Sequence, residues 1–161
     1  MPNFKKVILG IDPGLADTGY GIIEKDGQKI KMLGCGSIKT PAQDDFILRL
    51  KTIHWQLVRL IKKYQPQAAA VEQLFFSKNV KTALLVGQAR GVCLLTIAQW
   101  KLTMAEYTPL QVKQALTGYG RADKHQIGQM VKVLLNLNKI PRPDDAVDAL
   151  AVAITCAHSI K

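Results

Sequence analysis

Carboxylates stand inside apolar segments at three widely separated places in this 161-residue chain. Asp12 ends an apolar run, Glu72 lies within another, and Asp144, Asp145 and Asp148 open the last apolar stretch. An ionised carboxylate in an apolar interior is costly unless a positive charge compensates it, and a divalent cation is a common compensation. We therefore expect the fold to bring these three places together at one metal site.

Composition indicates a soluble globular protein, and we expect one domain over residues 1–161. Apolar residues make up 48% of the chain, which is enough for one core. Lys and Arg number 22 against 12 Asp and Glu, a net charge of +10 that favours nucleic acid as the partner, although basic surfaces also occur near ribosomes and membranes. The first apolar run is too short for a signal sequence or a membrane span, so we expect the cytoplasm.

Apolar patterning predicts an α/β fold with the element order βββαβαβαα. We expect strands at 6–11, 18–24, 31–38, 68–74 and 103–107, and helices at 44–64, 80–100, 124–137 and 144–159. Asp26-Gly27 is typical of a tight hairpin turn, so the first strands form a meander, while helices connect the later ones. This order indicates a mixed five-stranded β-sheet flanked by α-helices.

Asp12 and Glu72 each have a structural alternative. Asp12 begins an Asp-Pro-Gly turn, but it also ends a buried strand, at the sheet edge where mixed α/β proteins place ligands. Glu72 would face water if its strand were at the edge of the sheet. If that strand lies beside the first one, the two carboxylates face each other and need a cation between them.

The last acidic cluster contains one pair that shares a helical face. Asp145 and Asp148 are three residues apart, whereas Asp144 and Asp148 are four apart, so spacing does not choose between Asp144 and Asp145. Asp144 also suits a helix start. Carboxylate ligands without His or Cys suit Mg²⁺ or Mn²⁺, and two such ions about 4 Å apart would activate water and stabilise the leaving oxygen of a phosphodiester.

Six stretches, in order along residues 6–158, resemble the RuvC family of bacterial Holliday-junction resolvases. They are Ile8-Leu9-Gly10-Ile11-Asp12-Pro13-Gly14, Thr18-Gly19-Tyr20-Gly21, Val71-Glu72-Gln73, Gly87-Gln88-Ala89-Arg90-Gly91, Gln111-Val112-Lys113 and Asp145-Ala146-Val147-Asp148-Ala149-Leu150-Ala151. The resemblance implies an RNase H-like fold, a two-fold homodimer, paired symmetric Mg²⁺-dependent nicks in a four-way DNA junction during recombination and repair, and RuvA and RuvB as partners.

The same resemblance implies the roles of individual residues. The catalytic and metal-binding acids fall on Asp12, Glu72, Asp145 and Asp148, which leaves Asp144 as a helix cap. Because all four acids are intact, we expect an active enzyme.

Basic and aromatic residues are expected around these acids. Lys113 and Lys124 match the family's basic residues near the scissile phosphate, although surface lysines are the plain alternative. Phe75 matches an aromatic that stacks on a base, although Phe75 or Phe76 would serve equally well in a core. Further DNA contacts are expected at Lys78, Lys81, Arg90 and Arg121.

The predicted helix at 80–100 is the candidate dimer contact, with packing inside one chain as the alternative. The residues along its proposed contact side are Ala83, Leu84, Gly87, Gly91 and Leu94.

Other functions remain to be distinguished. The YqgF group of RNase H-like proteins shares a strand-end Asp and a late helical Asp. ATPases of the actin and sugar-kinase type share the first strand but need two such domains. A non-catalytic junction-binding protein would use the positive charge and have no need of four convergent carboxylates.

Overall fold

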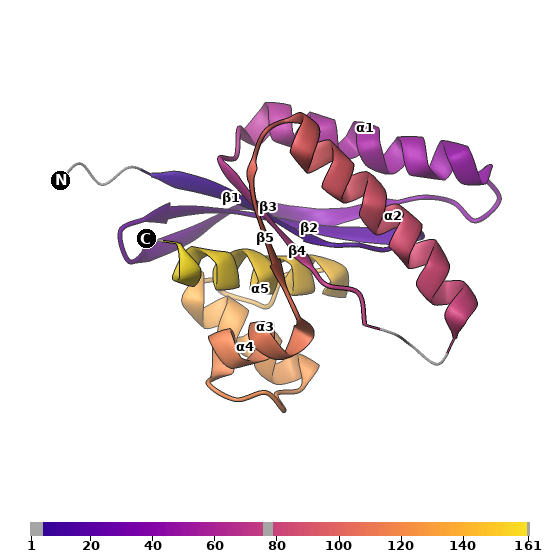
Figure 1. Cartoon of the computed structure of the whole chain (residues 1–161). Coiled ribbons are helices and arrows are strands. Elements are labelled where there is room, and N and C mark those ends of the chain that lie inside the picture. Colours follow the sequence, from indigo (N-terminus) through magenta and orange to yellow (C-terminus); the bar gives the residue numbers. More distant parts are fainter. Residues whose placement is uncertain (1–4, 76–78, 161) are drawn as a thin grey trace.

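The computed structural model describes residues 5–75 and 79–160. In that part of the chain one mixed sheet has the strand order β3-β2-β1-β4-β5 (Figure 1). Its strands are β1 (Lys6–Asp12), β2 (Asp17–Asp26), β3 (Lys29–Lys39), β4 (Ala68–Glu72) and β5 (Thr103–Tyr107). The first three form an antiparallel meander, and β4 lies parallel to β1 and β5. The predicted mixed five-stranded sheet is confirmed.

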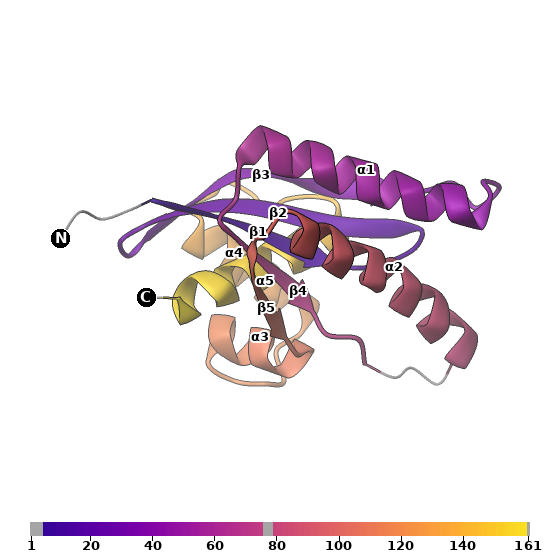
Figure 2. The ribbon, with the colours of Figure 1, turned by 45° about the horizontal axis from the view of Figure 1, so that its top comes forward.

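Helices cover both faces of this sheet. They are α1 (Phe46–Tyr64), α2 (Val80–Gln99), α3 (Pro109–Thr117), α4 (Lys124–Leu134) and α5 (Asp144–Ser159). In two views, α1 and α2 lie on one side of the sheet and α5 lies on the other, with α3 and α4 beyond it (Figures 1 and 2).

The sequence prediction missed α3 and placed two element ends too late. α3 has only nine residues, too few for a clear apolar period. β4 ends at Glu72 because Glu72 pairs with Tyr107, where β5 also ends. α4 ends at Leu134, and Asn136 shortly after it has a φ of 52°, a left-handed conformation that does not continue a helix.

Two buried layers result from the alternation of side chains along the central strands. Ile8 and Ala70 face the layer formed with α3, α4 and α5, whereas Leu9 and Val71 face the layer formed with α1 and α2. Successive side chains of a strand point to opposite faces, so a strand covered on both faces is apolar throughout. β1 and β4 therefore form the centre of the core.

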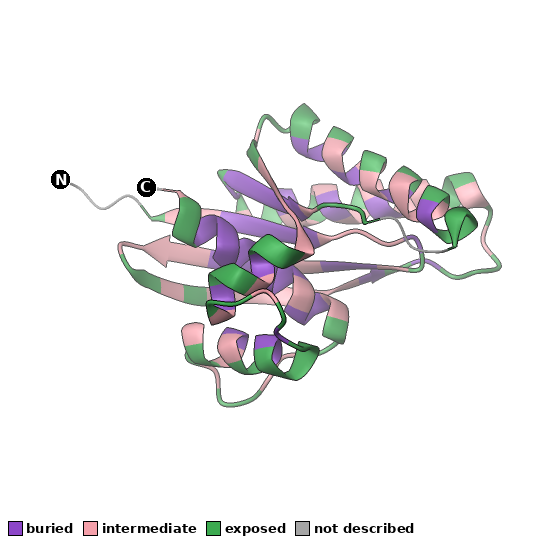
Figure 3. Cartoon of the chain, turned by 60° about the horizontal axis from the view of Figure 1, so that its bottom comes forward, coloured by how far each residue is buried: buried purple, intermediate pink, exposed green. Residues whose placement is uncertain are grey.

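α5 is buried over most of its surface and lies very close to β1 (Figure 3). Gly10 makes this approach possible: a Cβ atom there would collide with the Ala149 carbonyl oxygen and lie 2.8 Å from Ala153 Cβ. The small residues along α5 allow the same closeness from the helix side. The position of α5 on the sheet is thus fixed by backbone contact.

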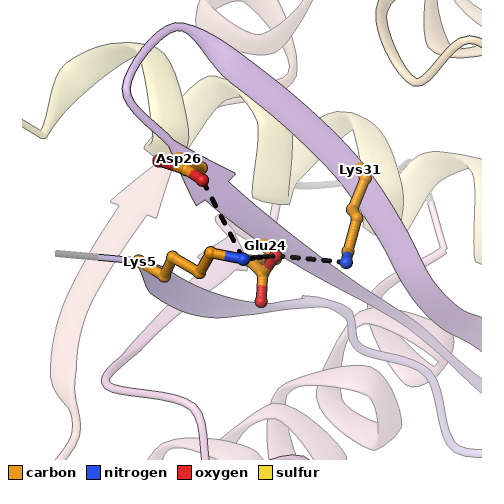
Figure 4. A network of polar contacts seen from close by, with 4 residues as sticks. All are labelled: Lys5, Glu24, Asp26 and Lys31. Carbon is orange, nitrogen blue, oxygen red and sulfur yellow. Dashed lines mark hydrogen bonds and ion pairs between the residues drawn. The ribbon is translucent and has the colours of Figure 1, made fainter. Parts of the chain in front are cut away.

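Charged side chains at the far end of the meander neutralise one another (Figure 4). Glu24 Oε1 lies 3.2 Å from Lys31 Nζ and 3.4 Å from Lys5 Nζ, and Lys5 Nζ lies 3.9 Å from Asp26 Oδ2. The hydrogen bond from Lys31 and the nearby lysine charges lower the pKa of Glu24. Carboxylates at this end therefore have lysine partners.

Among the described residues, α2 is the one helix whose length and apolar composition would suffice to cross a membrane. This is weak evidence for a membrane span, because helices that pack on a soluble core pass the same test. Ala89, Cys93 and Ile97 of α2 pack in the layer shared with α1.

Candidate active site

Four carboxylates converge where β1 and β4 end and α5 begins. Asp12 and Glu72 are the last residues of the parallel neighbours β1 and β4, and Asp145 and Asp148 lie in the first turns of α5. One carboxylate oxygen from each of Asp12, Asp145 and Asp148 lies within 4.8 Å of the others. Glu72 lies beside this group: it lines one cleft with Asp12 and another with Asp148, and its charge helps to raise the pKa of Asp12. The predicted convergence is confirmed.

Asp144 does not belong to this cluster in the described part of the chain. It is the first residue of α5, and the cap position is Pro143, which makes no side-chain capping hydrogen bond. The prediction that Asp144 caps the helix was wrong, because Asp144 is already inside the first turn. Its exposed carboxylate still lies favourably near the positive end of the helix dipole.

A second glycine brings α5 to the acids of the sheet. Gly19 of β2 pairs with Asp12, and a Cβ atom at Gly19 would collide with the Asp145 backbone carbonyl oxygen. The absence of a side chain at Gly19 lets the first turn of α5 lie directly on the end of the sheet.

Burial and mutual repulsion raise the pKa values of these acids and so favour their protonated forms. Burial is the largest effect on Asp12 and, together with the charges of Glu72, Asp148 and Asp145, raises its pKa to about 8. Burial is also the main cause of the raised pKa values of Glu72, Asp145 and Asp148. The pKa of Glu24, in contrast, is lowered. A bound cation would offset the burial and the repulsion that raise the pKa values of the four acids.

We predict that the metal-free protein loses stability as the pH rises. The pKa of Asp12 is raised from 3.8 in the unfolded chain to about 8 in the folded one. The folded state therefore binds this proton more tightly, and the stability that Asp12 contributes is fully present below pH 3.8 and is lost as the pH rises through about 8. In EDTA, Asp12→Asn should remove much of this decrease and raise the melting temperature at pH 8 by several degrees, at roughly 2–4 °C per kcal/mol.

Thermal unfolding in EDTA at pH 5.5 and pH 8 measures this effect, and Glu24→Gln serves as the surface control. An equal pH dependence in wild type and Asp12→Asn would contradict the prediction.

Two lysines face the acids across a cleft of about 440 Å³. This lysine cleft is lined by Glu72, Lys113, Lys124 and Asp148 among others. Lys124 Nζ lies 4.0 Å from Asp148 Oδ2, and the Lys124 charge lowers the pKa of Asp148 against the larger effect of burial. Both lysines also oppose the rise in the pKa of Glu72. The structure therefore brings both predicted lysines to the acids.

Capping residues set the start of the helices that carry these lysines. Thr108 and Gln111 form a reciprocal capping box at α3, and Asp123 and Gln126 form another at α4. The Thr-Pro-x-Gln pattern at 108–111 is the signal that would have revealed α3 in the sequence.

A second cleft, of about 250 Å³, adjoins the acids and shares Glu72 and Pro109 with the lysine cleft. This phenylalanine cleft is lined by Asp12, Glu72, Phe75 and Arg90 among others. Phe75 is 63% exposed, so its ring is displayed and not part of the core. Phe76, the alternative stacking residue, lies outside the described residues.

The other predicted DNA contacts have different surroundings. Arg90 Nη2 lies 2.6 Å from Glu106 Oε2, and Arg90 Nε donates a hydrogen bond to the Glu72 carbonyl oxygen at 3.3 Å. Arg90 therefore holds the end of β4 in place. Lys81 and Arg121 are exposed and line none of the clefts around the acids. Lys78 lies outside the described residues.

Comparisons with known proteins agree with the geometry of the site. The family described as crossover junction endodeoxyribonuclease RuvC matches residues 8–156. RuvC of Halothermothrix orenii is 58% identical over 155 residues, which cover 96% of this chain and 94% of that protein. RuvC of Alkaliphilus oremlandii is 60% identical over 153 residues, which cover 95% of this chain and 93% of that protein.

A solved structure extends the agreement to the fold. RuvC of T. thermophilus in complex with a Holliday junction substrate has a TM-score of 0.90 and 35% sequence identity, covering 96% of this chain and 94% of that one. The α/β fold is thus the RNase H-like fold expected from the sequence resemblance. The chain belongs to the RuvC family of crossover junction endodeoxyribonucleases.

Proposed function

We propose that this chain, as a single nuclease domain over residues 1–161, resolves Holliday junctions by paired symmetric nicks in DNA recombination and repair. The observation that carries the proposal is the convergence of Asp12, Asp145 and Asp148, with Glu72 beside Asp12 in the wall of one cleft. The two adjoining clefts would offer lysines and an exposed aromatic ring to a DNA strand bound at the acids. Family membership supports the cytoplasm as the location and RuvA and RuvB as partners.

The acids fit Mg²⁺, with Mn²⁺ as a substitute. The donors are carboxylate oxygens only, and the raised pKa of Asp12 reports negative charge that no protein cation fully compensates. Asp12, Glu72, Asp145 and Asp148 would hold two ions, which supply an activated water and stabilisation of the 3′ leaving oxygen when bound. Lys113 and Lys124 approach from the opposite wall of the lysine cleft and contact the scissile phosphate.

We predict that Lys124→Gln lowers cleavage far more than binding. Loss of one group that stabilises developing charge costs about 10²–10³ in rate, whereas loss of one phosphate contact costs about tenfold or less in affinity. Single-turnover cleavage and junction affinity should be measured side by side. Lys29→Gln, at the far hairpin, is the matched control and should change neither quantity.

Equal losses of cleavage and binding in Lys124→Gln would remove its catalytic assignment. The same measurement on Lys113→Gln tests the second lysine.

We propose the outer face of α2 as the homodimer contact. Leu84 and Leu95 are exposed by 64% and 59%, and a Cβ atom at Gly91 would meet no atom within 4 Å. Ala83 and Leu94, which were predicted to lie on the contact side, pack within the chain and do not belong to this outer face. An isologous dimer supplies two sites related by the same two-fold symmetry as a four-way junction.

Sedimentation of Leu84→Arg tests the dimer, and Ile47→Arg on the exposed face of α1 is its control. Monomeric Leu84→Arg with unpaired nicks would support the contact, whereas a wild-type protein that stays monomeric would exclude it.

The proposed function is tested by Mg²⁺-dependent cleavage of a mobile four-way junction, a linear duplex and an RNA/DNA hybrid. We expect paired symmetric nicks on the junction alone. Cleavage of the hybrid would instead indicate an RNA-processing nuclease like those of the YqgF group. Junction binding without nicks in any metal would indicate a non-catalytic binding protein.

A further inference from the structure

A third cleft, of about 240 Å³, continues from the lysine cleft at the first turns of α4 and α5. The two clefts share Lys124 and Asp148, and the lysine cleft shares Glu72 with the phenylalanine cleft. We call the third one the arginine cleft, because Arg142 and His125 line it. The three clefts are therefore linked in series through shared residues, with Phe75 in the lining of the first and Arg142 in the lining of the last.

The arginine cleft contains an arginine that forms no ion pair with a described carboxylate. In the part of the chain that the structure describes, Arg142 is exposed and forms no ion pair, unlike Arg90, which is paired with Glu106. The His125 ring lies beside it in the cleft wall, and its Nε2 atom is 3.3 Å from Gln129 Nε2. Arg142 is thus available to an anion, whereas the His125 ring nitrogen is already in contact with the Gln129 amide.

The remaining lining suits a nucleotide more than a free ion. Ile140, Pro141 and Val147 supply an apolar wall that a nucleotide sugar can contact and a free ion cannot, and Asp144 and Asp148 complete the lining. A guanidinium can donate two parallel hydrogen bonds to one phosphate, which fixes its orientation as well as its position.

We propose that Arg142 binds a backbone phosphate of the cleaved strand next to the scissile phosphate. The inference rests on the proposed function and adds a substrate-binding site to it. A strand anchored in the arginine cleft on one side and stacked on Phe75 on the other is held at two points. The phosphate between them is then fixed against the acids, which favours an in-line attack.

The first experiment measures junction affinity in EDTA as a function of salt for wild type, Arg142→Gln and Arg142→Lys. Each phosphate contact contributes about 0.7–0.9 to the slope of log affinity against log salt, so Arg142→Gln should lower the slope by about that amount. Its affinity should fall about tenfold, the loss expected for one charge-assisted hydrogen bond. Arg142→Lys should keep the slope and lose part of the affinity. Arg59→Gln, on α1 in the other layer, should match wild type.

The second experiment uses junctions with a single neutral methylphosphonate at each position around the cut. At one position the substitution should weaken wild type about tenfold and leave Arg142→Gln unchanged, because the contact is already absent. Additive losses at every position, or an unchanged salt slope, would overturn the proposal. If Arg142→Gln melts well below wild type, Arg142→Met, which also removes the charge, takes its place in the same comparison.

Failure of this inference is distinguishable from failure of the proposed function. If wild type nicks junctions and Arg142→Gln behaves like Arg59→Gln, only the arginine cleft is misassigned. If wild type does not discriminate a junction from a linear duplex, the proposed function itself is wrong.

Discussion

Replacing Glu72 by Gln is expected to lower Mg²⁺-dependent junction cleavage by about 10³-fold or more while junction affinity stays within about threefold, a loss equivalent to about 4 kcal/mol in the transition state. The amide has the size of the carboxylate but no charge, so the site loses part of its attraction for cations. Binding depends on the cationic side chains of the clefts, none of which this change removes. Single-turnover cleavage at saturating enzyme, with junction affinity in EDTA, separates the two effects.

Glu24→Gln is the matched control for Glu72→Gln. It makes the same chemical change at the opposite end of the sheet, where lysines neutralise the carboxylate, and should leave cleavage unaltered. In EDTA, Glu72→Gln should also melt no lower than wild type, because it removes repulsion between Glu72 and Asp148. Retained cleavage, or a parallel loss of binding, would exclude Glu72 from the catalytic acids.

The cost of buried charge made the core of the site predictable from the sequence. Asp12 and Glu72 interrupt apolar runs, and the strand order expected from a mixed α/β pattern places those runs side by side. Spacing alone left Asp144 and Asp145 equivalent. The rotation of α5 on the sheet selects Asp145, and that rotation depends on backbone contacts at Gly10 and Gly19 that no periodicity reveals.

Side chains whose partners are distant in sequence were the hardest to interpret. From the sequence, Arg90 is predicted to be a surface cation in a helix. In the structure it forms an ion pair with Glu106 of β5 and donates a hydrogen bond to the Glu72 carbonyl oxygen. Arg142 stands in a proline-rich connection without any motif, and only the packing of α4 against α5 shows that it lines a cleft. Local patterns do not contain this information, because such contacts form only when the elements pack.

The same reasoning explains why the strand ends were less predictable than the strands. Ala68 to Leu74 is apolar enough to continue, but the ladder needs a partner, and β5 ends at Tyr107 opposite Glu72. Ending there turns the chain out of the sheet, so Phe75 reaches the cleft beside Asp12. The stop at Glu72 is therefore part of the site.

The second large effect is expected from Gly10→Ala. The new methyl group would collide with the Ala149 carbonyl oxygen, and a main-chain atom inside a packed helix cannot move aside alone. We expect destabilisation of about 3 kcal/mol, which corresponds to a fall of roughly 6–12 °C in melting temperature. Gly87→Ala in α2 is the matched control, because its Cβ atom would lie at an ordinary 3.7 Å from Leu74 Cδ2.

A loss of stability alone would not show that Gly10 positions the site, so metal affinity is the decisive second measurement. Ala149 lies one residue after Asp148 on α5, and a helix pushed off the sheet carries Asp145 and Asp148 away from Asp12. Gly10→Ala should therefore weaken Mn²⁺ binding to the folded protein as well as its stability. Ile53→Ala, which opens a cavity in the layer of α1, should cost a similar 2–5 kcal/mol and leave Mn²⁺ affinity unchanged. If both variants bind Mn²⁺ like wild type, the close approach of α5 serves packing and not the geometry of the acids.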